Sequence, residues 1–107
     1  MKTTYIVIFV TTKDKAQASK IAKALLEAKL IACANIIKGV SSMFWWQGKV
    51  DQAQETLLIL KTKANLFKKV EAKVKSLHSY EVPEIIALPI VAGSSAYLKW
   101  IDGSVRA

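Results

Sequence analysis

The segment from His78 to Glu84 gathers the residue types that most often carry chemistry. It places the only histidine of the chain, Tyr80 and the carboxylates Glu81 and Glu84 within seven residues. Imidazole and carboxylate groups bind transition metals and transfer protons. Helical spacing precedes the segment and an apolar run follows it, which predicts a loop between a helix and a strand, a common position for functional residues.

Metal binding is the first chemistry to consider, because it needs three or four nitrogen, sulfur or oxygen donors. One chain offers Cys33, Met43 and His78 together with several carboxylates. No CxxC or HxxxH spacing occurs, so the pattern alone is a weak metal signal. Two structural interpretations remain open: Cys33 as a small buried apolar residue and His78 as a cap at the end of a helix.

Nucleophilic catalysis is disfavoured although Cys33, Asn35 and His78 are the residue types of a thiol-protease-like set. A catalytic thiol needs partial exposure and a lowered pKa. Cys33 lies in the apolar segment 30–34, which is typical of a core strand. The two glutamates of the 78–84 segment have no matching substrate site, and we expect them to be charges at the entrance to a strand. The sequence therefore predicts no enzymatic activity.

Charge and length restrict the partners. The net charge is +8, but Arg106 is the only arginine among 16 basic residues. Because base and phosphate readout favours the arginine fork, we expect a lysine-rich solubilising surface and no nucleic-acid partner. The strand expected at 55–60 also has no aromatic residue on which a base could stack. The apolar run Tyr5–Val10 is too short to span a membrane.

Two further observations bear on compartment and ligand. Cys33 is the only cysteine, so no intrachain disulfide can form and a reducing compartment such as the cytoplasm is expected. The four glycines are scattered at Gly39, Gly48, Gly93 and Gly103, so no glycine-rich phosphate loop is present. A nucleotide ligand is therefore not predicted.

The pattern predicts one α+β domain over residues 1–107 with a ferredoxin-like β-α-β-β-α-β order and a short C-terminal helix. The expected elements are strand Tyr5–Val10, a helix capped by Asp14 and ending near Lys29, strand Leu30–Val40 extended to Trp46 with a bend at Gly39, a turn at Gln47-Gly48, strand Glu55–Thr62, a helix capped by Asn65, strand Ile85–Val91 and helix Ala96–Gly103. The last helix is expected to bury Tyr97, Leu98 and Ile101. Two helices cover only one sheet face, so the apolar second face predicts contact with another subunit.

With these elements in place, the chain resembles the CutA family over essentially its whole length. The matching blocks are Ala32–Ile36, Ser42–Lys49, Glu55–Thr62, His78–Ile90 and Tyr97–Ile101. The chain departs from the family pattern at Ser79, where proline is usual, and at Gln47, where glutamate is frequent. The resemblance implies a cytoplasmic homotrimer with an architecture like that of PII signalling proteins, linked to copper and divalent-cation tolerance.

The resemblance also implies a way for metal ligands that are scattered along one chain to meet. If protomers face one another, they could pool ligands in one cleft: His78, Cys33, and Glu55 or Glu84. Copper, or another divalent cation, would suit this set. The alternative is a PII-like small-ligand sensor with no physiological metal, in which the cleft would be lined by His78, Tyr80, Glu84, Trp45 and Lys61. The three tryptophans are expected at subunit contacts.

Overall fold

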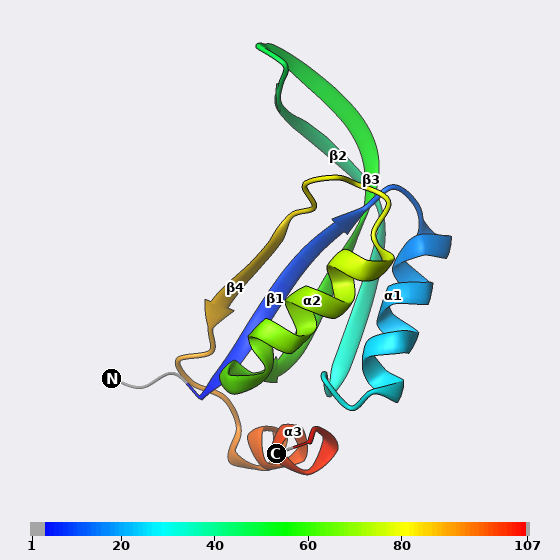
Figure 1. The fold of residues 1–107 in the computed structure, drawn as a ribbon. Helices are drawn as coiled ribbons and strands as arrows, with labels where there is room; N and C mark the ends of the chain where they lie inside the picture. Colours follow the sequence, from blue (N-terminus) through cyan, green and yellow to red (C-terminus); the bar gives the residue numbers. More distant parts are fainter. Residues whose placement is uncertain (1–3, 107) are drawn as a thin grey trace.

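The computed structural model describes residues 4–106 and shows a four-stranded antiparallel sheet with three α-helices (Figure 1). The elements in chain order are β1 (Tyr5–Thr12), α1 (Lys15–Glu27), β2 (Cys33–Trp46), β3 (Lys49–Lys63), a 3₁₀ turn (Ala64–Leu66), α2 (Phe67–Leu77), β4 (Ile85–Pro89) and α3 (Ser95–Ser104). The predicted α+β class and order of elements are confirmed.

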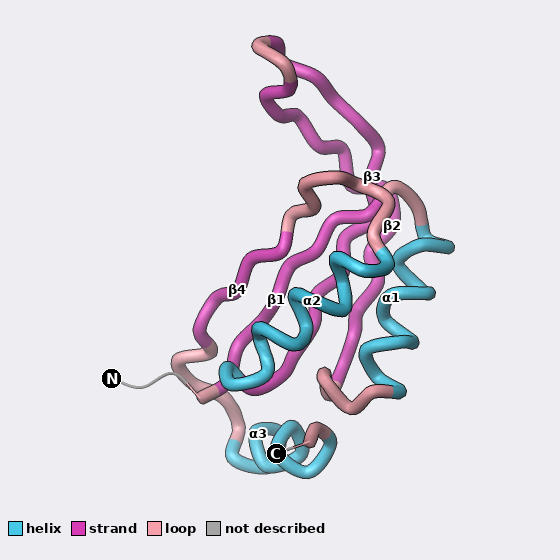
Figure 2. The backbone as a smooth tube through the Cα atoms, viewed as in Figure 1, coloured by secondary structure: helices cyan, strands magenta, loops and turns pink. Residues whose placement is uncertain are grey.

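The sheet has the strand order β2-β3-β1-β4, so β1 is a central strand that pairs with β3 and β4. Helices α1 and α2 lie on one face of this sheet, and α3 packs at one end of it (Figure 2). Side chains alternate strictly along β1, where every second one from Ile6 to Thr12 is buried. This period of two separates a helix-covered face from an open face.

The core fills the space between the helix-covered face and the two helices. Its fully buried side chains come from β1, β3, α1 and α2, and include Ile8, Val10, Leu58, Leu60, Ile21, Leu25, Val70 and Val74. Each such side chain contributes roughly 1.5–3 kcal/mol through removal of apolar surface from water. The helical spacing of these residues on α1 and α2 is the pattern that the sequence predicts.

Helix starts were predicted with mixed success. The Asp14 carboxylate accepts the Gln17 backbone N–H at 2.9 Å, which confirms the predicted cap of α1. The predicted Asn65 cap is wrong, because Asn65 lies exposed inside the 3₁₀ turn and α2 begins at Phe67 without a side-chain cap. The tighter turn takes the chain from β3 into α2 and leaves no extended residue to cap it.

Several boundaries also differ from the prediction. Helix α1 ends at Glu27, two residues early, because Lys29 takes a left-handed φ of 57° and its N–H bonds to the Leu26 carbonyl. Strand β4 ends at Pro89, two residues before the predicted Val91, although the Ile90 N–H still donates to the Tyr5 carbonyl at 3.0 Å. The prediction that Tyr97 is buried is wrong: 41% of its surface is exposed, whereas Ile101 of the same helix is fully buried.

The β2–β3 hairpin extends well beyond the rest of the sheet (Figure 1). A register shift between Ile37 and Val40 confirms the bend predicted at Gly39, which has a φ of 73°. Beyond it the two strands pair as far as Trp46 and Lys49. The connecting Gln47-Gly48 pair has positive φ at both positions, as in a type I′ turn. We refer to residues 41–54 as the hairpin arm.

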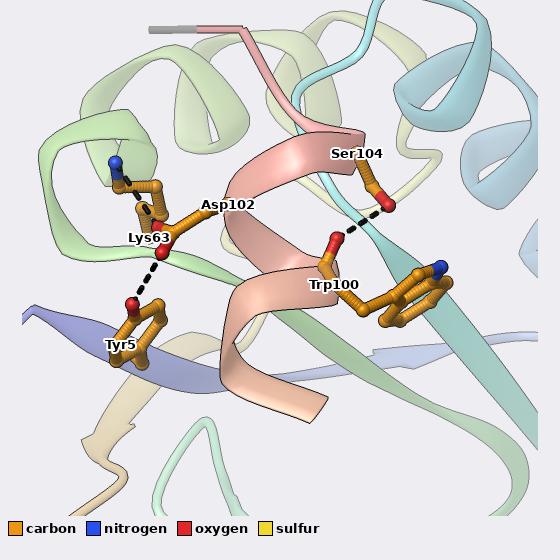
Figure 3. A network of polar contacts seen from close by, with 5 residues as sticks. All are labelled: Tyr5, Lys63, Trp100, Asp102 and Ser104. Atoms are coloured by element: carbon orange, nitrogen blue, oxygen red, sulfur yellow. Dashed lines mark hydrogen bonds and ion pairs between the residues drawn. The ribbon is translucent and has the colours of Figure 1, made fainter. Parts of the chain in front are cut away.

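Helix α3 is tied to the sheet by one polar network (Figure 3). The Tyr5 hydroxyl donates to the Asp102 carboxylate at 2.7 Å, and the Lys63 ammonium lies 3.3 Å from the same group. The hydrogen bond from Tyr5 lowers the pKa of Asp102, and Lys63 adds to this effect. The network joins β1, β3 and α3, and it fixes α3 beside the open face of the sheet.

Candidate functional site

His78 follows α2 and both of its ring nitrogens are engaged. Its backbone N–H donates to the Val74 carbonyl, which closes the last turn of the helix. The Nε2 atom lies 2.7 Å from the Thr11 carbonyl, which can only accept, so Nε2 carries the proton. The Tyr80 backbone N–H donates to Nδ1 at 3.0 Å. His78 therefore connects α2, the end of β1 and the loop that follows.

Tyr80 and Glu55 form the second part of this cluster. The Tyr80 hydroxyl donates to the Glu55 carboxylate at 2.8 Å, and only 8% of Glu55 is exposed. Burial, together with the hydrogen bond and charge of Glu55, raises the pKa of Tyr80 to about 12. The rings of His78 and Tyr80 lie 4.7 Å apart. We call His78, Tyr80 and Glu55 the imidazole cluster.

Glu81 and Glu84 do not join the imidazole cluster through any hydrogen bond or ion pair recorded within residues 4–106. Both are exposed on the loop before β4. The 78–84 segment is thus a loop between α2 and β4, as the sequence predicts. The carboxylate that contacts this loop is instead Glu55 of β3, which accepts the Tyr80 hydroxyl. No sequence pattern links the two residues, because they are 25 positions apart.

Cys33 lies elsewhere, at the start of β2 on the open face. The expectation that it belongs to the core is wrong, because it is partly exposed. The Lys61 ammonium lies 3.9 Å from the Cys33 thiol and also donates to the Asn35 side chain, which lies 3.8 Å from the sulfur. Burial and the nearby Cys33 thiol raise the pKa of Tyr97 on α3. We call these residues the thiol cluster.

The two clusters are separated along the sheet. Cys33 stands opposite Lys61, which pairs with Val7, whereas His78 bonds to Thr11, four residues further along β1. At the rise of a strand this offset is about 13 Å. One chain therefore does not bring Cys33 and His78 into one coordination sphere, and residues 4–106 contain no group of three His, Cys, Asp or Glu side chains that could hold a metal ion.

The open face and the hairpin arm carry the exposed apolar surface. The open face exposes 43% of Ile37, 50% of Ile86 and 44% of Leu88. On the arm, Trp45 is 75% exposed and Trp46 53%. Such a contiguous apolar surface marks an interaction site more often than a free surface.

Comparison with known proteins identifies the relatives. A family model described as CutA1 divalent ion tolerance protein matches residues 6–104. The divalent-cation tolerance protein CutA of Thermus thermophilus is 47% identical over 95 residues, which cover 89% of this chain and 92% of the relative. The chloroplastic protein CutA 1 of Oryza sativa is 44% identical over 101 residues. That match covers 94% of this chain, which spans only 57% of the rice protein's length.

Solved structures agree with the sequence matches. The divalent cation tolerance protein of Thermus thermophilus superposes with a TM-score of 0.93 at 44% identity, covering 95% of this chain and 99% of that one. CutA1 from the psychrotrophic bacterium Shewanella sp. SIB1 superposes with a TM-score of 0.96 at 37% identity over the whole of both chains. The relatives' names place them in different compartments, since the rice protein is chloroplastic and an Archaeoglobus fulgidus structure is described as periplasmic. Within residues 4–106, no helix has the length and apolar character needed to cross a membrane.

Proposed function

Because the chain belongs to the CutA1 divalent ion tolerance family, we propose that it serves divalent-cation tolerance as a metal-binding homotrimer and not as an enzyme. The proposal covers residues 1–107 as a single ferredoxin-like domain acting in the cytoplasm, with copper as the preferred ion. The observation that supports it is the exposed apolar surface of the hairpin arm and of the open face beyond the end of the sheet where α3 packs.

Association between copies supports the proposal, because one protomer leaves large aromatic side chains in water. Trp45 and Trp46 project on an arm that has no core of its own. Packing the arm against another copy would bury these rings and the apolar open face together. A closed ring of copies would satisfy every such contact, since heterologous contacts close only when the rotation between copies completes a circle. The number three is what the family resemblance implies.

The imidazole cluster provides the best fit for a metal donor. A metal-binding histidine commonly donates its second ring N–H to a backbone carbonyl, which fixes its tautomer. His78 makes this bond from Nε2 to Thr11. The lone pair of Nδ1 then becomes the donor, and a metal ion would displace the Tyr80 N–H that now occupies it. Glu55 lies in the same cluster as a carboxylate donor.

The remaining donors would come from neighbouring protomers. Cys33 is partly exposed on the open face, and Glu84 is exposed on the loop before β4. Because imidazole and carboxylate suit Cu(II) while thiolate suits Cu(I), we expect His78 to dominate Cu(II) binding and Cys33 to matter more for Cu(I).

Calorimetric titration of the apo protein with Cu(II) and Zn(II) tests the proposal, with light scattering on the same sample to give the assembly mass. We expect a trimer that binds about one Cu(II) per chain, with affinity reduced at least about tenfold by His78→Ala and less by Cys33→Ala. The variant Glu81→Gln serves as a control, since Glu81 is an exposed carboxylate outside the proposed ligand set.

Three outcomes would count against the proposal. Equal Cu(II) binding by His78→Ala and the parent protein would remove His78 from the site. An intact trimer without saturable metal binding would favour the PII-like sensor, whose ligand should then raise the melting temperature in a metabolite screen. A monomer in the scattering cell would exclude any site shared between protomers.

A further inference from the structure

A shallow hollow on the helix-covered side of the molecule, largely open to solvent, is lined by positive charge. It has a volume of about 360 Å³ and lies where the end of α1, the outer side of α2 and the segment after α3 meet. Its lining consists of Ala28, Leu30, Lys69, Ala72, Lys73, Ser76 and Arg106. We call it the basic pocket. None of its residues belongs to the proposed metal site.

Three cationic side chains converge on the basic pocket from two segments. Lys69 and Lys73 are one helical turn apart on α2 and therefore share a face. Arg106 is held beside them because its backbone N–H donates to the Lys29 carbonyl at 3.0 Å. Among residues 4–106, no carboxylate lines the pocket and none of these three cations forms an ion pair.

The carboxylate of Glu71, near the pocket in sequence, already forms ion pairs with other lysines. Glu71 lies between Lys69 and Lys73 in sequence, but its carboxylate pairs with Lys75 at 3.5 Å and with Lys68 at 3.9 Å. The charge of Glu71 is therefore balanced by lysines outside the pocket lining. The lining cations keep an unbalanced positive potential, which attracts anions.

The end of α1 does not oppose an anion as strongly as a bare helix end would. Its last carbonyls accept backbone N–H groups: Leu25 from Leu30, Leu26 from Lys29, and Lys29 from Arg106. The Leu30 carbonyl accepts the Thr62 hydroxyl at 2.6 Å. Because these oxygens are satisfied within the chain, the partial negative charge at this helix end is reduced towards the pocket.

We propose that the basic pocket binds a small multiply charged anion that carries phosphate or carboxylate groups. The planar guanidinium of Arg106 suits two-point contact with either group, and the two ammonium groups supply further charge-assisted bonds. Leu30, Ala28 and Ala72 offer an apolar wall for the body of the ligand. Because the hollow is open, the ligand would stay partly in solvent and the three cations would provide most of the contact. The pocket is complete in one protomer and lies away from the open sheet face, so this proposal does not depend on the trimer or on metal binding.

Calorimetry with two probes, inorganic pyrophosphate and citrate, tests the proposal on the full chain in about 0.1 M salt, where distant surface charges are largely screened. We expect saturable binding near one anion per chain. The double variant Lys69→Gln/Lys73→Gln should weaken it by about tenfold or more, and Arg106→Gln should weaken it too. The matched control is Lys15→Gln/Lys20→Gln, which removes the same charge from exposed positions on α1 and should change the affinity less than about threefold.

The probes and the variants separate the possible results. Binding of pyrophosphate alone supports a phosphate ligand, and binding of citrate supports a carboxylate ligand. An equal loss in both double variants would reduce the effect to net charge and overturn the proposal. Absence of saturable binding by either probe would do the same. A lower melting temperature of Lys69→Gln/Lys73→Gln with unchanged anion binding would assign these lysines to stabilising the end of α1 instead.

Discussion

The two faces of the same sheet differ in what covers them. On the helix-covered face, Ile8 and Leu58 are fully buried by α1 and α2. On the open face, Ile86 and Leu88 keep about half of their surface in water, although they are equally apolar. Successive side chains of a strand point to opposite faces of the sheet, so neighbouring residues of one strand lie on different faces. The first face completes the fold of one chain, and the second leaves apolar side chains in water.

The comparison also explains where the functional residues lie. Among residues 4–106, the fully buried core contains no titratable side chain, and the polar clusters lie outside it. His78, Tyr80 and Glu55 meet where α2 ends, while Cys33 and Lys61 meet on the open face. If copies associate through the open face as proposed above, Cys33 and Lys61 would lie at that interface.

The largest effect is expected from truncating the helix-covered face. Leu58→Ala should lower the free energy of unfolding by about 2–5 kcal/mol, because it leaves a cavity between β3 and the helices. Urea denaturation measures this loss. The neighbouring Ile59→Ala changes the open face; its cost should be smaller at low protein concentration and grow as copies associate. Equal, concentration-independent losses would contradict the difference between the faces.

A somewhat smaller effect is expected on the hairpin arm. Trp45→Ala should weaken association by about 2 kcal/mol or more, as truncation of a buried interface tryptophan does. Light scattering over a dilution series measures the shift towards smaller species, while the unfolding of the protomer should change little. Leu26→Ala on α1 is the control, since Leu26 is 41% exposed on the helix layer. An unchanged dissociation constant for Trp45→Ala would exclude the arm from the interface.

The smallest effect concerns Tyr80 at high pH. Its pKa is about 12 in the folded protein and about 10 when unfolded, so the folded state holds the proton more tightly. This group therefore leaves stability unchanged below pH 10 and lowers it as pH rises from 10 towards 12. Ultraviolet titration of the tyrosinates should show a late phase that Tyr80→Phe removes. The pKa values of Tyr5 and Tyr97 are also raised, so the decisive phase is the one near pH 12; its survival in Tyr80→Phe would contradict the assignment to Tyr80.

Most of the fold was predictable because local sequence patterns determine its helices and strands. The alternation of β1, the stripe of Val70 and Val74 on α2, and the Asp14 cap each act within a few residues. The wrong predictions concern positions whose environment depends on the packing of distant segments. Asn65 resembles a cap, but the 3₁₀ turn replaces the capping position. Tyr97 has the spacing of a buried residue, but α3 lies at the end of the sheet and leaves it exposed.

The candidate site was predictable only in its parts. The 78–84 loop and the choice of His78 as a candidate follow from residue types, whereas the bond from Tyr80 to Glu55 joins segments that only the folded sheet brings together. Cys33 resembled a core residue because its apolar neighbours Ile31 and Ala32 are buried. The basic pocket was not predicted, since Arg106 and Lys73 are distant in sequence and the lysines of α2 have the pattern of a solvent-exposed helix face.

The position of β1 has a consequence for how the chain folds during synthesis. Of the described elements, β1 is synthesised before the others, yet it lies in the middle of the sheet, and its partners β3 and β4 end at Lys63 and Pro89. An apolar strand with two unpaired edges is prone to pair wrongly with other chains. Only α1 is available early to shield it. The nascent chain is therefore most exposed to misassociation before β3 has emerged, and the rate of synthesis through residues 28–63 sets how long that exposure lasts.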